Sequence, residues 1–104
     1  MIVSLDQDEW DLLTGAGPRV LAYFTADWCE PCKRMSPSME SVAEDLSDRI
    51  QTVKINVDSC PNVSSKLGIR SLPQLVILED AQEKGRRVGY LTQSQIRDFI
   101  SNHL

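Results

Sequence analysis

Apolar runs and alternating patterns divide this chain into predicted strands and helices. Residues 19–25 are mostly apolar, with β-branched and aromatic side chains, which is typical of a short strand buried on both faces. Residues 74–78 show the same pattern, whereas residues 52–57 alternate apolar and polar positions and predict a half-buried strand. Shorter strands are predicted at residues 1–3 and, at a sheet edge, at residues 87–90.

The first helix is predicted from signals at both of its ends. Asp6 and Glu9 have the spacing of a capping box, which predicts that a helix begins after Asp6. Leu5 and Trp10 are placed as a hydrophobic staple around the same turn. The glycines and the proline within residues 15–18 predict where this helix ends.

A longer helix is predicted after Cys29, because apolar residues recur there at spacings of three and four and so share one helix face. The residues of this face are Met35, Met39, Val42, Ala43 and Leu46. Pro37 lies inside the pattern and removes one backbone donor, which predicts a kink. Residues 62–67 predict a short helix ended by Gly68, and residues 80–85 predict a polar turn.

The last helix is predicted from a second capping box, formed by Thr92 and Gln95. Its apolar face carries Ile96, Phe99 and Ile100. The predicted order of elements is therefore β-α-β-α-β-α-β-β-α. Strands that alternate with helices predict an α/β fold with a largely parallel sheet, which the final hairpin makes mixed.

Length and composition indicate a single domain over residues 1–104. Of the 104 residues, 41% are hydrophobic and 25% are charged, as in globular proteins. A net charge of −4 disfavours nucleic-acid binding, and no apolar run approaches the roughly 20 residues of a membrane span. Residues 1–6 lack the features of a secretory signal, so a cytoplasmic protein is expected. Three cysteines are too few for a disulfide scaffold and favour a chemical use of thiols.

The informative chemistry lies in Cys29 and Cys32, which follow a predicted buried strand and open a predicted helix. Unpaired N–H groups and the dipole at a helix N-terminus stabilise a thiolate, the reactive form of cysteine. Pro31 fits the first turn, where its missing N–H is not needed. We expect Cys29, the more exposed thiol, to attack a substrate disulfide and Cys32 to resolve the mixed disulfide. Trp28 is expected to form an apolar wall beside the pair.

Other interpretations of the cysteines are weaker. A zinc site needs two further ligands, and only Cys60 and His103 remain, at spacings unusual for zinc. A purely structural disulfide would close a very small loop and add little stability. Cys60 itself is interpreted as an inert loop thiol, with a regulatory role as the alternative.

From these residues the sequence resembles the thioredoxin family over its whole length. Residues 29–32 match the family's C-G-P-C motif except at Glu30. The other matching features are Pro37, residues 54–58, residues 68–73 and Gly89. The resemblance implies a thioredoxin fold, with a central, mixed, mostly parallel five-stranded sheet flanked by helices on both faces.

The resemblance also implies a substrate groove beside the cysteines. It implies a cis peptide between Leu72 and Pro73, with a trans proline that begins the next strand as the alternative. The residues implied for the groove are Trp28, Val57, Leu72, Pro73, Val88, Gly89 and Tyr90. Val57 and Val88 are equally compatible with ordinary core positions.

Four residues are expected to tune the redox pair, namely Tyr23, Glu30, Pro31 and Lys54. Tyr23 stands where the family has a buried aspartate that helps to move the proton of the second cysteine. Tyrosine is a much poorer base at neutral pH, so resolution is expected to be slower unless water or Lys54 substitutes. Glu30 opposes a nearby thiolate while it suits the helix dipole, and we expect a slightly more reducing pair, with a plain solvated acid as the alternative.

The expected function is that of a protein-disulfide reductase with the redox-active disulfide Cys29–Cys32. The resemblance implies disulfide-containing protein substrates, recharging by an NADPH-dependent thioredoxin reductase, and no cofactor bound by the chain itself. We also expect a monomer that binds no metal, nucleic acid or membrane. Leu72 before the proline resembles the reducing members of the family. The alternatives are a disulfide oxidant or isomerase, and a binding module that uses the groove around Trp28 and Pro73 without turnover.

Overall fold

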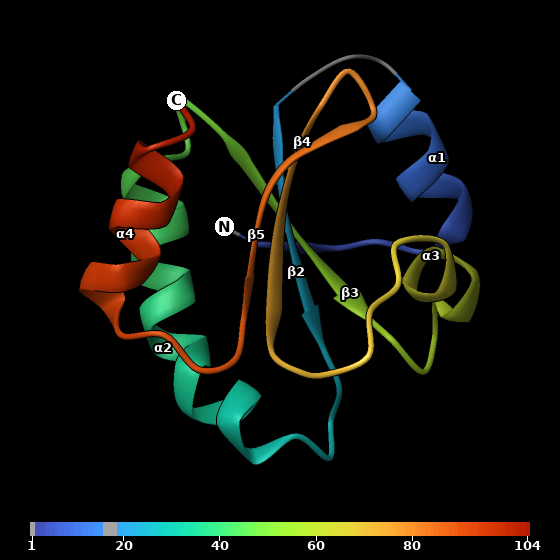
Figure 1. The fold of residues 1–104 in the computed structure, drawn as a ribbon, viewed down its shortest axis with the longest axis horizontal. Coiled ribbons are helices and arrows are strands. Elements are labelled where there is room, and N and C mark those ends of the chain that lie inside the picture. The colour runs from blue at the N-terminus through green and yellow to red at the C-terminus, as the bar shows by residue number, and fades with distance from the viewer. Residues whose placement is uncertain (1, 16–18) are drawn as a thin grey trace.

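The strands form one sheet that is covered by helices (Figure 1). The computed structural model describes residues 2–15 and 19–104. The elements in chain order are β1 (Val3–Ser4), α1 (Gln7–Gly15), β2 (Val20–Thr25), α2 (Glu30–Asp45), β3 (Gln51–Asn56), α3 (Pro61–Lys66), β4 (Gln74–Glu79), β5 (Gln82–Val88) and α4 (Gln93–Ser101). This order is the predicted one.

The sheet has the strand order β1-β3-β2-β4-β5, with β2 at its centre. β1 and β2 each pair with β3 in parallel, whereas β4 is antiparallel to both β2 and β5. Four of the five described strands therefore run in one direction and β4 runs against them. The expected thioredoxin fold, with a mixed five-stranded sheet, is confirmed.

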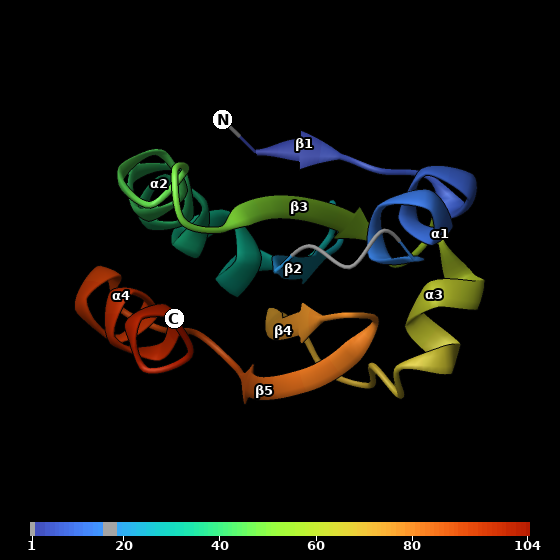
Figure 2. The ribbon, with the colours of Figure 1, turned by 90° about the horizontal axis from the view of Figure 1, so that it is seen from above.

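Helices lie on both faces of the sheet, as Figure 2 shows from above. All six residues of β2 are buried, because alternate side chains enter two separate apolar clusters. Leu21 and Tyr23 point into the cluster under α2 and α4, whereas Ala22 and Phe24 point into the cluster under α1 and α3. A strand covered on both faces reads as a continuous apolar run, which explains why its sequence signal is strong.

Both predicted capping boxes are formed. The Glu9 N–H donates to the Asp6 carboxylate over 2.8 Å, and the Asp6 N–H donates to the Glu9 carboxylate over 3.2 Å. At α4, Thr92 and Gln95 exchange the equivalent bonds. Leu5 and Trp10 belong to the same apolar cluster, as the predicted staple requires. Pro37 lies within α2, which continues through it.

The hairpin at the end of the sheet differs from the prediction. The turn is only Asp80 and Ala81, both at positive φ, and β5 begins at Gln82 where a polar turn was predicted to continue. The strand also ends at Val88, before Gly89, whose φ is +95°. β5 is an edge strand whose residues are largely exposed, so apolar residues do not recur along it at every second position. Its strand structure is therefore determined by pairing with β4.

The other strand bounds agree within one residue, except near the N-terminus. β1 is Val3–Ser4, whereas a strand over residues 1–3 was predicted. Met1 and residues 16–18, on which the predicted strand start and helix end partly fall, lie outside the described residues.

Candidate functional site

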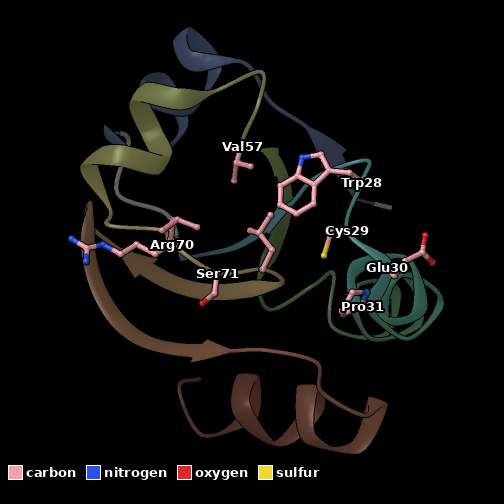
Figure 3. Close-up of a pocket in the computed structure, with 9 residues that line it drawn as sticks. Trp28, Cys29, Glu30, Pro31, Val57, Arg70 and Ser71 are labelled. Atoms are coloured by element: carbon pink, nitrogen blue, oxygen red, sulfur yellow. The ribbon is translucent and has the colours of Figure 1, made fainter.

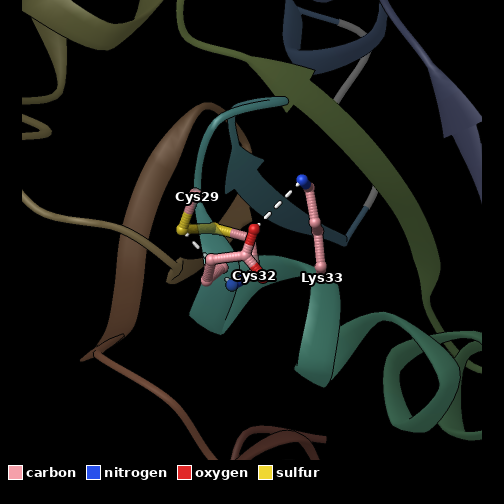
Figure 4. Close-up of polar contacts among 4 residues, drawn as sticks. Cys29, Cys32 and Lys33 are labelled. Atoms are coloured by element: carbon pink, nitrogen blue, oxygen red, sulfur yellow. Dashed lines mark hydrogen bonds and ion pairs between the residues drawn. A yellow bond between two sulfur atoms is a disulfide. The ribbon is translucent and has the colours of Figure 1, made fainter.

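The cysteine pair lies at the start of α2, just after the connection from β2. Cys29 is the N-cap of α2, and its sulfur accepts a hydrogen bond of 3.2 Å from the Cys32 N–H. Pro31 occupies the first helical turn, as predicted. The two cysteines form a disulfide with their Cα atoms 5.2 Å apart (Figure 4). Two intervening residues on the first turn therefore place the two sulfurs within bonding range.

The disulfide separates two cavities. We call the larger one, of about 550 Å³, the groove cavity; Cys29 borders it. The smaller one, of about 210 Å³, is the rear cavity, and Cys32 borders it. The two cysteines are 4% and 2% exposed, so Cys29 is only slightly the more exposed in the disulfide form. The two cysteines differ in the cavity that they line: Cys29 lines the groove cavity and Cys32 the rear cavity.

The groove cavity brings together only part of the predicted groove. Its lining is Trp28, Cys29, Glu30, Pro31, Val57, Ile69, Arg70, Ser71 and Leu72. Figure 3 shows Arg70 and Ser71 on the side opposite Glu30 and Pro31. Trp28, Val57 and Leu72 therefore lie where the sequence predicted a groove. Val57 is half-buried and packs against the cysteines, so it is both a core and a lining residue.

Four predicted groove residues do not line this cavity. Pro73 is buried, and its carbonyl accepts a hydrogen bond of 2.8 Å from the Gly89 N–H. Val88 and Tyr90 are 54% and 45% exposed, so Val88 is not a core position. The Arg34 guanidinium lies 5.1 Å from the centre of the Tyr90 ring. These residues form exposed surface next to the proline.

Ile69, Arg70 and Ser71 line the groove cavity but were not predicted to do so. The sequence did hold the signal, because they precede Leu72 within the segment 68–73 that resembles the family's proline loop. The peptide between Leu72 and Pro73 is cis, as predicted. We call residues 68–73 the groove loop.

Trp28 is exposed yet held in place. It is 66% exposed, and its indole N–H donates a hydrogen bond of 2.9 Å to the Asp58 carboxylate. Asp58 is itself oriented, because its N–H donates to the Asn56 side-chain oxygen over 2.9 Å. The end of β3 thus fixes an apolar wall beside Cys29.

Tyr23 and Lys54 meet Cys32 at the rear cavity. They lie directly opposite each other on β2 and β3. Tyr23 is 2% exposed, and burial raises the pKa of its hydroxyl, an effect partly offset by a hydrogen bond with the Thr25 side chain. A raised pKa makes tyrosine a still poorer base at neutral pH. Lys54 is half-buried.

Glu30 is the residue that replaces the family's glycine, and it points to solvent. Its carboxylate lies 3.2 Å from the Lys33 amine, with both side chains more than half exposed. Figure 4 shows Lys33 on α2 beside the disulfide. The negative charge next to Cys29 is thus partly compensated within the same helical turn.

Cys60 is not part of this site. It is 1% exposed, and its thiol donates to the Leu5 carbonyl over 3.3 Å. Burial, and to a lesser extent the negative charge of Asp6, raise the pKa of this thiol. Across the described part of the chain there is no group of three or more metal-ligating side chains.

Comparison of the sequence with known proteins identifies the family of this chain. The thioredoxin family model matches residues 1–102. The chain belongs to the thioredoxin family. It is 35% identical over 104 residues to the thioredoxin of Acidithiobacillus ferridurans, covering 100% of this chain and 95% of that protein. It is 38% identical over 85 residues to thioredoxin 1 of Synechococcus elongatus, covering 82% of this chain and 79% of that protein.

Family membership and the disulfide together fix the type of activity. The protein is a thiol–disulfide oxidoreductase of the thioredoxin family, and it reduces protein disulfides. No helix in residues 2–15 and 19–104 combines the length and the apolar character that a membrane span needs.

Proposed function

We propose that Cys29 is the nucleophile and Cys32 the resolving thiol. The observation that carries this assignment is that Cys29 borders the groove cavity, whereas Cys32 faces the rear cavity. A substrate disulfide in the groove meets Cys29 first. As N-cap of α2, the Cys29 sulfur also accepts the Cys32 N–H, a bond that becomes stronger when the sulfur is a thiolate.

The reaction then has two exchange steps. The Cys29 thiolate attacks one sulfur of the substrate disulfide, the S–S bond breaks, and the other substrate sulfur leaves as a thiolate that takes up a proton. The Cys32 thiol loses its proton and attacks the Cys29 sulfur, forming the Cys29–Cys32 disulfide and releasing the second substrate thiol. Two electrons pass from the protein dithiol to the substrate.

The groove accepts an extended segment of a protein substrate. Trp28, Val57 and Leu72 offer apolar surface next to Cys29. Among the described backbone–backbone hydrogen bonds outside the helices and strands, none uses the N–H or carbonyl of Leu72. Those two groups are therefore open to pair with a substrate backbone, as in strand addition.

Family membership and composition support a proposal for the cellular setting of the protein. The chain works as one monomeric domain over residues 1–104 in the cytoplasm, binds no cofactor itself, and is recharged by an NADPH-dependent thioredoxin reductase. Its net charge of −4 and the chemistry of its site support this setting. Glu30, Pro31 and Lys54 tune the rate and the potential of the pair, whereas Tyr23 supplies no base at neutral pH.

Trapping the intermediate tests the assignment of the two thiols. We expect Cys32→Ser to accumulate a mixed disulfide with a protein substrate, because no second thiol resolves it. The matched variant Cys29→Ser is expected to give no such adduct at the groove. Adducts through Cys32 alone would reverse the roles, and a Cys29→Ser, Cys32→Ser protein with full biological activity would favour a binding module.

The reduction potential separates a reductant from an oxidant. A value near about −270 mV, as in thioredoxin, supports a cytoplasmic reductant. A value above about −200 mV would instead identify an oxidant or isomerase. The measurement equilibrates the protein with defined thiol buffers and counts trapped free thiols.

A further inference from the structure

Two carbonyl groups around the groove loop are bonded by side chains of the β4–β5 hairpin. The Arg86 guanidinium donates a hydrogen bond of 2.7 Å to the Leu67 carbonyl, at the C-cap of α3. The Gln74 side-chain nitrogen donates to the Ser71 carbonyl over 3.1 Å. One bond therefore holds the residue before the loop, and the other holds the loop just before Leu72.

The two side chains are also joined to each other. Arg86 donates a hydrogen bond of 2.8 Å to the Gln74 side-chain oxygen. The amide orientation is assigned from its partners, because only this orientation places a donor against the Ser71 carbonyl and an acceptor against Arg86. Gln74 is 3% exposed, so both of its polar atoms need such partners.

The register of the β4–β5 hairpin brings Arg86 and Gln74 together. Arg86 lies opposite Val76, and Gln74 is two residues before Val76, so Arg86 and Gln74 are diagonal neighbours on one sheet face. Glu83 accepts two further hydrogen bonds from the guanidinium, of 3.0 and 2.6 Å. The planar fork of arginine allows one side chain to hold three partners at fixed angles.

The backbone of the groove loop forms few other hydrogen bonds among the described residues. Gly68 and Ile69 donate back to α3, to the Ser65 and Ser64 carbonyls. Beyond them, the described backbone–backbone bonds outside helices and strands include none from residues 70–72. The same residues line the groove cavity. The side chains of the hairpin therefore supply the hydrogen bonds that hold the part of the loop facing the substrate.

We propose that Arg86, acting through Gln74, is a positioning residue for protein substrates, because it holds the Arg70–Leu72 backbone in the conformation that receives an extended chain. This inference rests on the proposed use of the groove. It separates two classes of substrate. A protein disulfide pairs with the loop, whereas a small disulfide needs only access to Cys29.

The test compares Arg86→Met with Arg87→Met on two substrates. Arg87 is the adjacent, exposed arginine of β5 and lies opposite Leu75. Its side chain forms no hydrogen bond or ion pair with the other described residues. For Arg86→Met we expect kcat/KM for a protein disulfide to fall about tenfold, mainly through KM, because misplaced positioning groups lower rates by up to about 10²-fold. Reduction of hydroxyethyl disulfide and the reduction potential are expected to stay unchanged, and Arg87→Met is expected to match the parent on both substrates.

A second set of variants distinguishes the positioning role of Arg86 from misfolding and from a general effect on stability. Gln74→Met removes the Ser71 bond while it keeps a similar volume, and we expect the same substrate-selective loss. Arg86→Lys keeps the charge but not the fork, so it is expected to rescue the loss only in part. Amide NMR shifts should change at residues 70–72 in each variant and stay constant at Cys29.

The possible outcomes are distinct. Equal losses on the protein disulfide and the small disulfide, or unchanged kinetics with the protein disulfide in both Arg86→Met and Gln74→Met, would overturn the positioning role. A parent protein that reduces neither substrate would instead overturn the proposed function of the cysteine pair.

Discussion

The Tyr23 hydroxyl donates a hydrogen bond of 3.0 Å to the backbone carbonyl of Cys32. Tyr23 therefore connects the central strand β2 to the first turn of α2, directly at the second cysteine. Its hydroxyl proton is engaged with a backbone oxygen, and burial raises its pKa. At the position where the family has an acid, this chain therefore has a tyrosine that fixes the first turn of α2. It does not have a base that could take the proton of the Cys32 thiol.

Removing the hydroxyl should therefore affect stability and leave the chemistry intact. For Tyr23→Phe we expect the free energy of unfolding to fall by about 1 kcal/mol, the usual contribution of one buried hydrogen bond. The rate at which Cys32 resolves a mixed disulfide at neutral pH is expected to stay within about twofold of the parent, because tyrosine contributes no base there. Denaturant unfolding and single-turnover kinetics measure the two quantities.

The pH dependence of resolution provides the control for this variant. If Tyr23 were the base, Tyr23→Phe would slow resolution by at least about 10²-fold and would shift its pH profile. Such a result, with stability unchanged, would contradict the anchoring role.

Cys60 is expected to make the fold less stable in mild alkali. Its thiol has a raised pKa in the folded protein, whereas in the unfolded chain it titrates near about 8.5. Between the two pKa values the unfolded chain binds fewer protons than the folded protein, so the free energy of unfolding falls as pH rises. Its contribution is fully present below the unfolded pKa and is lost as pH rises through the folded one.

Cys60→Ala tests this sign. The free energy of unfolding of the oxidised protein is measured in urea between about pH 7 and pH 9.5, below the pH range in which Tyr23 titrates. This free energy should depend less on pH in the variant than in the parent. Oxidised protein is used because the disulfide-bonded Cys29 and Cys32 do not titrate. A parent whose stability is constant, or rises, across this range would refute the prediction.

The parts of the fold that could be predicted are those with local signals. The capping boxes at Asp6 and Thr92 are closed by side chains three residues away, so the sequence carries both partners. β2 is recognisable because both of its faces are buried. The cysteine pair is recognisable because its position between this strand and a helix carries the chemistry.

The parts that could not be predicted depend on partners far away in the sequence. Residues 82–85 belong to strand β5 because β4 pairs with them, although their sequence predicts a polar turn. Arg86 gains its role from Leu67 and Gln74, which only the hairpin brings close. The sequence predicts that Tyr23 is a poor base, but it does not reveal the bond to the Cys32 carbonyl, which follows from how α2 packs on β2.

Glu30 should make the pair slightly more reducing. Its charge disfavours the Cys29 thiolate, but the exposed Lys33 beside it and solvent screen most of the effect. For Glu30→Gly we expect the potential to become more positive by about 10 mV, since 30 mV corresponds to about 1.4 kcal/mol. Glu30→Gln is the matched variant that removes the charge without adding a glycine to the helix. A shift of either variant toward more negative potential would show that the sign is wrong.

The two-residue turn between β4 and β5 holds Ala81 in an unfavourable backbone conformation. Asp80 and Ala81 have φ angles of 54° and 62°, in the left-handed region. This conformation costs an L-residue about 1–2 kcal/mol, and aspartate tolerates it better than alanine. Glycine adopts it freely but loses more entropy on folding, so the two effects partly offset.

Ala81→Gly is therefore expected to raise the free energy of unfolding by about 1 kcal/mol. Ala81→Val, which adds a β-branched side chain at the same φ, is expected to lower it. Neither change should alter disulfide reduction, because the turn lies at the opposite end of the hairpin from the start of α2 (Figure 1). Denaturant unfolding of the three proteins measures the order of stability. An Ala81→Gly protein less stable than the parent would mean that alanine is not strained at this position.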